Sequence, residues 1–101
     1  MQIIYLRRAL ADMSWVRRYY SKVFPQGRVR ANEQLTKAEQ IISENPLAGK
    51  PSENVRGARE WVVGRTPFSL VYSVKNNSIE ILRVVDNRSN WAAVAVYDED
   101  E

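Results

Sequence analysis

The chain has 101 residues, 45% of them hydrophobic, which suits one ordinary domain built around a single core. It contains no cysteine and no histidine, which excludes disulfides, thiolate nucleophiles, cysteine or histidine metal sites and imidazole as a general base. Any proton transfer here has to use carboxylate, lysine, tyrosine or arginine side chains. No metal motif is present, and the glycines lack phosphate-loop spacing, so we expect no metal and no cofactor.

The charge is distributed unevenly along the chain. The formal net charge is +3, but four of the twelve acidic residues form the sequence DEDE at positions 98–101. Without this acidic tail the chain holds 15 basic and 8 acidic side chains, a balance of +7. A basic body suits a phosphate-bearing or acidic partner. We expect residues 1–97 to form a single domain that is followed by the tail at 98–101.

Two features bear on localisation. Strand-like sequence begins directly after Met1, without a basic and apolar leader, and no apolar run approaches roughly 18 residues. The sequence therefore predicts a cytoplasmic protein that does not contact a membrane.

The first half of the chain predicts one strand and two helices. Residues 2–6 (QIIYL) are apolar and rich in β-formers, as in a buried strand. Apolar residues then recur every three or four positions until Phe24, just before Pro25, which predicts an amphipathic helix ending there. A second such pattern starts around Ala31 and stops at Asn45, because a residue before proline is pushed away from helical angles. Helices joined by so short a connection should form an antiparallel hairpin.

The second half predicts a loop at residues 47–57 and then three strands, at 59–63, 68–74 and 79–85. Between the last two, Asn76-Asn77 suits a two-residue hairpin turn with positive φ angles. This turn would place four residue pairs opposite each other: Val74 and Ile79, Ser73 and Glu80, Tyr72 and Ile81, and Leu70 and Arg83.

This order of elements predicts an α+β domain of β-α-α-β-β-β type. The helical hairpin should pack on one face of a small, mainly antiparallel sheet. Residues 91–97 are apolar enough to pack or pair, and their pattern suits a helix as well as a strand.

Five short motifs give the chain a resemblance to a known family. They are Ala9-x-x-Asp12-Met13, PLAGKP at 46–51, GARE at 57–60, PFSLVYSV at 67–74 and IEILRVV at 79–85. In this order and spacing the sequence resembles the RelE/ParE toxin superfamily over nearly its whole length. Many members carry a histidine after the last motif, whereas this chain has Asp86.

The resemblance implies the toxin of a bacterial type II toxin–antitoxin module, which arrests growth until a cognate antitoxin neutralises it. Members of the ParE branch inhibit DNA gyrase without known nuclease chemistry, and the missing histidine favours this branch. The alternative is a RelE-like, ribosome-dependent mRNA endonuclease, and a further one is an inactive homologue that only binds antitoxin. Antitoxin and toxin would form a hetero-oligomer, with operator DNA contacted only through the antitoxin.

Arg83 interrupts an otherwise apolar strand face. A buried charge without compensation costs several kcal/mol, so the guanidinium needs a carboxylate or an open cleft. One interpretation is a structural ion pair, with Glu60 as the candidate partner. The other is a contact to phosphate or to an acidic partner, which the guanidinium fork also fits.

Other charged residues complete the candidate site. For a nuclease, the candidates are Arg59, Arg65, Arg83 and Arg88, with Asp86 or Glu60 moving the proton. Neighbouring arginines would lower the pKa of such a carboxylate and make it a poor base. For target binding without catalysis, the predicted contacts are Glu60, Arg65, Arg83, Asp86, Arg88 and Trp91. The arginines at positions 7, 8, 17 and 18 are interpreted as helix-surface charge.

Overall fold

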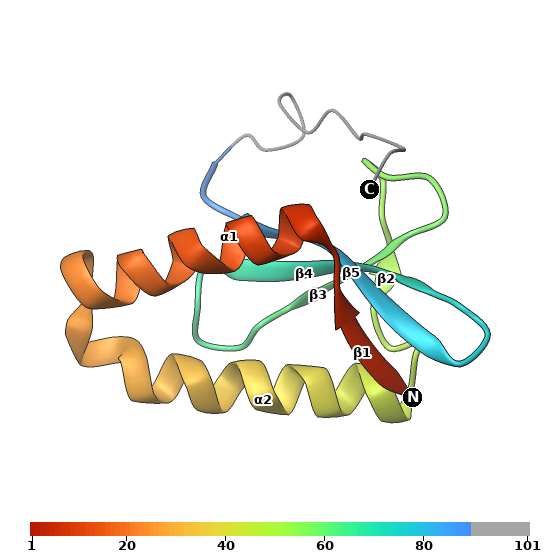
Figure 1. The fold of residues 1–101 in the computed structure, drawn as a ribbon, viewed down its shortest axis with the longest axis horizontal. Coiled ribbons are helices and arrows are strands. Elements are labelled where there is room, and N and C mark those ends of the chain that lie inside the picture. The colour runs from red at the N-terminus through yellow and green to blue at the C-terminus, as the bar shows by residue number, and fades with distance from the viewer. Residues whose placement is uncertain (90–101) are drawn as a thin grey trace.

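The computed structural model describes residues 1–89 as two helices packed against a five-stranded mixed sheet (Figure 1). The predictions that concern Trp91, residues 91–97, the domain boundary at 97 and the tail at 98–101 lie outside the described residues. In chain order the elements are β1 (Gln2–Tyr5), α1 (Arg7–Arg18), η1 (Tyr19–Val23), η2 (Pro25–Gly27), α2 (Arg28–Glu44), β2 (Lys50–Pro51), β3 (Arg59–Val62), β4 (Phe68–Val74) and β5 (Ser78–Asp86).

The helical hairpin forms as the sequence predicts. α1 continues through the π-helical turn η1, which ends at Val23 with Phe24 as its C-cap, and α2 ends at Glu44 with Asn45 as its C-cap, ahead of Pro46. Figure 1 shows α1 and α2 running in opposite directions, joined at one end of the molecule. Within the described residues, neither helix is long and apolar enough to cross a membrane.

The sheet has the strand order β1-β5-β4-β3-β2, in which β1 and β5 are parallel and the other neighbours are antiparallel. The edge strand β2 lies inside the segment predicted to be a loop. Its two residues, Lys50 and Pro51, pair with Glu60 and Arg59 of β3. Such a strand escapes detection because it is short and contains proline, which is tolerated at sheet edges.

The predicted register of the last hairpin is right near the turn and wrong beyond it. Val74 faces Ile79 and Tyr72 faces Ile81, but Arg83 faces Val71 instead of Leu70. The reason is a β-bulge, which places one extra residue of β5 against β4. The turn also differs from expectation. Arg65 is the non-glycine residue with positive φ among residues 1–89, so Asn76-Asn77 turns without left-handed angles.

The core lies between the helices and one sheet face. Ala9 and Met13 of α1 and Ala38 and Ile42 of α2 are buried against this face. The strands contribute Leu70, Tyr72, Ile79, Ile81 and Val84 to the same cluster. A second, smaller cluster of Ala58, Val71 and Val85 packs apart from the helices. The side chain of Tyr72 is fully buried in the larger cluster.

Candidate functional site

Arg83 forms an ion pair with Asp12 of α1, not with the Glu60 that the sequence suggested. Its Nε lies 2.8 Å from Asp12 Oδ2, and its Nη2 lies 3.2 Å from Asp12 Oδ1. Asp12 Oδ2 also accepts a hydrogen bond of 2.9 Å from the backbone N–H of Val84. β1 ends at Tyr5, opposite Ile81, and does not extend alongside Val84. The Asp12 carboxylate therefore accepts the hydrogen bond from the Val84 N–H in place of a strand neighbour. The ion pair therefore fastens α1 to β5.

Arg59 is bound within the fold and does not join a cluster of arginines. Its Nη1 donates to the carbonyl oxygen of Gly49 at 2.7 Å. The hydroxyl of Tyr72 holds the same loop, because it donates to Pro46 O at 2.7 Å and accepts from the Gly49 N–H at 2.9 Å. Burial raises the pKa of the Tyr72 phenol, so this group is an uncharged hydrogen-bonding anchor.

Asp86 and Arg88 form a second ion pair at the end of β5. Arg88 Nη2 lies 2.8 Å from Asp86 Oδ2, and Arg88 Nε lies 3.0 Å from Oδ1. The hydrogen bond from Arg88 lowers the pKa of the Asp86 carboxyl, in the direction that the sequence predicted. The carboxyl is therefore ionised and occupied by its partner, which makes it a poor general base.

This pair predicts a pH dependence of stability. Since the folded-state pKa of Asp86 lies below its ordinary value of 3.8, its stabilising effect is present above that value and lost as pH falls through the folded pKa. We expect Asp86→Asn to unfold more easily than the wild type at about pH 6, and the difference to shrink as the pH falls below 3.8. Urea unfolding on both sides of this pH measures the difference. A difference that persists at the lower pH contradicts it.

The remaining candidates lie in different parts of the sheet. Arg65 is exposed in the turn between β3 and β4, with a φ of 60°. Arg88 is at the same sheet end, because its neighbour Asn87 donates a backbone hydrogen bond to Pro67 in that turn. Arg59 begins β3 and lies at the opposite end of the strand. Glu60 accepts a hydrogen bond of 2.6 Å from the Ser52 hydroxyl. The structure thus brings Arg65 and Arg88 to one sheet end and leaves Arg59 elsewhere.

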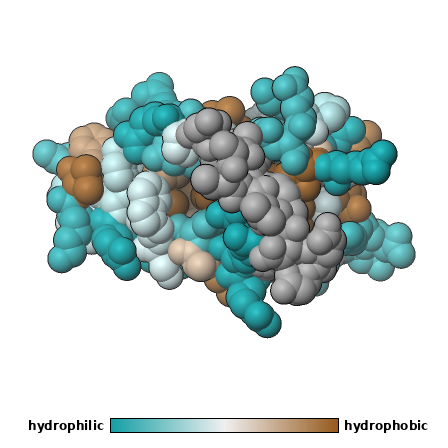
Figure 2. All heavy atoms as spheres, turned by 90° about the horizontal axis from the view of Figure 1, so that it is seen from above, coloured by the Kyte–Doolittle hydropathy of each residue, from teal (hydrophilic) through white to brown (hydrophobic). Residues whose placement is uncertain are grey.

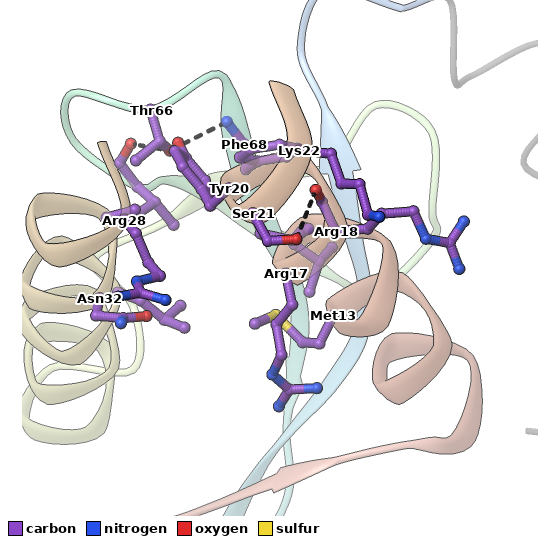
Figure 3. Close-up of a pocket in the computed structure, with 15 residues that line it drawn as sticks. Met13, Arg17, Arg18, Tyr20, Ser21, Lys22, Arg28, Asn32, Thr66 and Phe68 are labelled. Atoms are coloured by element: carbon purple, nitrogen blue, oxygen red, sulfur yellow. Dashed lines mark hydrogen bonds between the residues drawn. The ribbon is translucent and has the colours of Figure 1, made fainter. Parts of the chain in front are cut away.

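A pocket of about 630 Å³ opens between the helical hairpin and the sheet. We call it the hairpin groove. Its apolar lining includes Met13, Val16, Tyr20, Leu35, Phe68 and Val84. Its cationic residues are Arg17, Arg18, Lys22 and Arg28, and no carboxylate occurs among the described residues that line it. Figure 3 shows the side chains of Arg17 and Arg28, one from each helix, at the space between the two helices. Arg18 and Lys22 extend away from α2.

The sequence did not predict this groove. Arg17 and Arg18 were interpreted as ordinary helix-surface charge, and neither was connected with Arg28 on the second helix. One signal was present in the sequence: residues 1–32 hold seven basic side chains and a single acidic one, Asp12. Asp12 is bound to Arg83 and does not line the groove, so the four groove cations have no carboxylate beside them among the described lining residues.

The described residues include no group of three or more aspartate or glutamate side chains that could hold a metal ion. Instead they combine an apolar groove flanked by cations, two ion pairs that include β5, and a sheet end carrying Arg65 and Arg88. The helical hairpin on a small mixed sheet is the fold of the RelE/ParE class of toxins, as the sequence predicted.

Comparison with known proteins shows which family within this class the chain belongs to. A family model described as the ParE toxin of the type II toxin–antitoxin system parDE matches residues 3–91. Among solved structures, a chain of the chromosomal ParDE TA system from P. aeruginosa is similar, with 30% sequence identity and a TM-score of 0.67. The match covers 85% of this chain and 95% of that one. No curated protein matches. The chain belongs to the ParE toxin family of type II toxin–antitoxin systems.

Proposed function

We propose that this ParE-family toxin arrests growth by inhibiting DNA gyrase and that a cognate antitoxin neutralises it. The family match over residues 3–91 carries the proposal. The neighbouring structure comes from a ParDE system, which supports an antitoxin partner for this chain as well. Arg65, Asp86 and Arg88, which share one sheet end, are the proposed target contacts, and Trp91 is a further one outside the described residues.

Ribosome-dependent mRNA cleavage is less well supported by the same residues. Asp86, which stands where many relatives carry histidine, is ionised and paired with Arg88. Arg59 and Arg83 make bonds that hold the fold together, to Gly49 and Asp12. A general base needs a pKa near the working pH, and a carboxyl held by an arginine is shifted away from it.

Pulse labelling after induction tests the target in cells. When the toxin is induced alone, DNA synthesis should stop within minutes, while protein synthesis continues at first. The reason is that gyrase inhibition blocks replication before it depletes messenger RNA. An early stop in translation instead would favour mRNA cleavage. If neither process stops, the chain is an inactive homologue that only binds antitoxin.

We further propose that the hairpin groove receives the neutralising segment of the antitoxin. Its apolar floor suits one face of an amphipathic helix, and its four cations suit acidic residues beside that face. Residues of the groove come from α1, η1, α2 and the sheet, so an occupant would bridge all parts of the fold. The antitoxin segment is therefore expected to be amphipathic and acidic.

Charge removal at the groove tests this assignment. We expect the double variant Arg17→Ala/Arg28→Ala to bind the antitoxin about tenfold more weakly, with a smaller dependence on salt, because interfacial charge complementarity is lost. Lys37→Ala/Lys75→Ala is the matched control, since it removes two exposed charges outside the groove. Titration calorimetry at two salt concentrations gives both quantities. Equal weakening by both pairs would show a general charge effect and refute the groove assignment.

A further inference from the structure

An aromatic surface lies on α1 and η1, next to the end of β5. Trp15 keeps 46% of its surface exposed, although two aromatic neighbours hold its ring. It stacks on Tyr19 with ring centroids 6.1 Å apart and an interplanar angle of 22°. It also meets the edge of the buried Phe68 at 5.7 Å. A large ring that is fixed in place and still exposed can bind a partner without losing much side-chain entropy.

Arg88 connects this aromatic pair to β5. Its guanidinium carbon lies 5.1 Å from the centre of the Tyr19 ring, and its Nη1 donates to the Tyr19 hydroxyl at 3.3 Å. Together with the two bonds to Asp86, this uses three of the five N–H donors of the guanidinium. The side chain remains 54% exposed. Arg88 is thus held rigidly and has donors left for a partner.

We infer that Trp15, Tyr19 and Arg88 form the surface through which the toxin holds its protein target, and that this surface is separate from the hairpin groove. We call it the Trp15 face. The inference rests on the proposed function and adds to it two residues of the helical hairpin. Trp, Tyr and Arg are the residue types that carry most of the binding energy at protein interfaces.

Charge favours a protein over a nucleic acid as the occupant. The charge of Arg88 in the Trp15 face is balanced by Asp86, its ion-pair partner. A polyanion would therefore gain little electrostatic binding energy there. The rings of Trp15 and Tyr19 stack on each other, which leaves the outer surface of Trp15 for one apolar group. The surface therefore fits a protein that offers an apolar side chain next to a hydrogen-bond acceptor.

The Trp15 face and the hairpin groove lie at different surfaces. Trp15, Tyr19 and Arg88 are absent from the described residues that line the groove, and the two surfaces share the buried Phe68. Figure 2 shows the molecule from the side of α1, where hydrophobic side chains lie between hydrophilic ones. Substitutions at the Trp15 face should therefore weaken target binding and leave antitoxin binding intact.

The test compares Trp15→Ala with Leu10→Ala, a matched control on the same helix whose side chain is 54% exposed. We expect Trp15→Ala to bind purified gyrase about 30-fold more weakly, as at an interface hot spot. Leu10→Ala should stay within about twofold of the wild type. Both variants should bind the antitoxin like the wild type, which also shows that they fold. Fluorescence anisotropy of labelled toxin measures both affinities.

The following results would overturn the inference. Gyrase binding within twofold of the wild type overturns the inference. If Trp15→Ala also loses antitoxin binding, the test is repeated with Arg88→Ala, a substitution at an exposed side chain. An unchanged gyrase affinity of Arg88→Ala then overturns the inference. If Trp15→Ala weakens binding of a single-stranded DNA oligonucleotide instead of gyrase, the occupant is a nucleic acid and the assignment to a protein is wrong.

Failure of the proposed target is separable from failure of this inference. If the wild type does not bind gyrase, growth arrest after induction becomes the measure. Arrest that is lost in Trp15→Ala and kept in Leu10→Ala supports the Trp15 face, with another protein as target. Arrest kept by both variants overturns it, as does a wild type that arrests nothing.

Discussion

Asp12→Ala should destabilise the protein by about 3 kcal/mol, because it removes one partner of a largely buried ion pair. The side chains of Arg83 and Asp12 are 19% and 18% exposed, so water compensates the charge left on Arg83 only in part. The variant also leaves the backbone N–H of Val84 without its acceptor. Alanine favours helix more than aspartate by roughly half a kcal/mol, which offsets little of this loss.

Urea or guanidinium unfolding measures the change in free energy. Asp12→Asn serves as the graded control, because its amide oxygen can still accept from Val84 while the charge is gone, and it should fall between wild type and Asp12→Ala. Arg88→Ala removes an exposed ion-pair partner and should have a much smaller effect. A loss below about 1 kcal/mol for Asp12→Ala would show that the ion pair does not fasten α1 to β5.

Gly49→Ala should cost about 2–3 kcal/mol, since the added methyl group has no room. An ideal Cβ at this position would lie 2.6 Å from the Tyr72 hydroxyl and 2.7 Å from the backbone oxygen of Glu60. Neither group can retreat easily. Tyr72 is fully buried, and Glu60 belongs to β3. The loop at residues 46–51 would have to shift and give up its bonds to Tyr72 and Arg59.

Gly64→Ala is the matched control for this prediction. The nearest atom to its Cβ is Gln34 Oε1 at 2.9 Å, the end of a flexible side chain that can move aside. We expect its effect to stay within about 0.5 kcal/mol. Thermal unfolding of both variants gives the comparison. Equal stability of Gly49→Ala and wild type would mean that the loop does not pack on Tyr72 as described.

The hydrophobic pattern of the sequence was sufficient to predict the two helices, four of the five strands and the pairing next to the last turn. These features depend on residues that are close in the sequence, where the strand period of two residues and the helix period of 3.6 residues can be recognised. The family resemblance rested on motifs spread over the same elements, and the family match confirms it. The two-residue strand β2 was missed because no periodicity can develop over Lys50 and Pro51.

The site was less predictable because it depends on how distant elements meet. The bulge in β5 changed the register at Arg83, and the packing of α1 supplied Asp12 as its partner. Asp12 was visible in the sequence only as part of a family motif. In the same way, Arg17 and Arg28 share a groove only because the helices pack antiparallel, and Trp15 reaches Phe68 only after α1 docks on the sheet.

We propose above that this ParE-family chain acts on DNA gyrase as a protein-binding inhibitor. The most direct measurement adds the purified toxin to a gyrase supercoiling reaction, with and without the purified antitoxin. We expect that the toxin blocks supercoiling, that the antitoxin restores it, and that messenger RNA in a translating extract stays intact at the same toxin concentration. Unimpaired supercoiling together with cleavage of ribosome-bound message would contradict it.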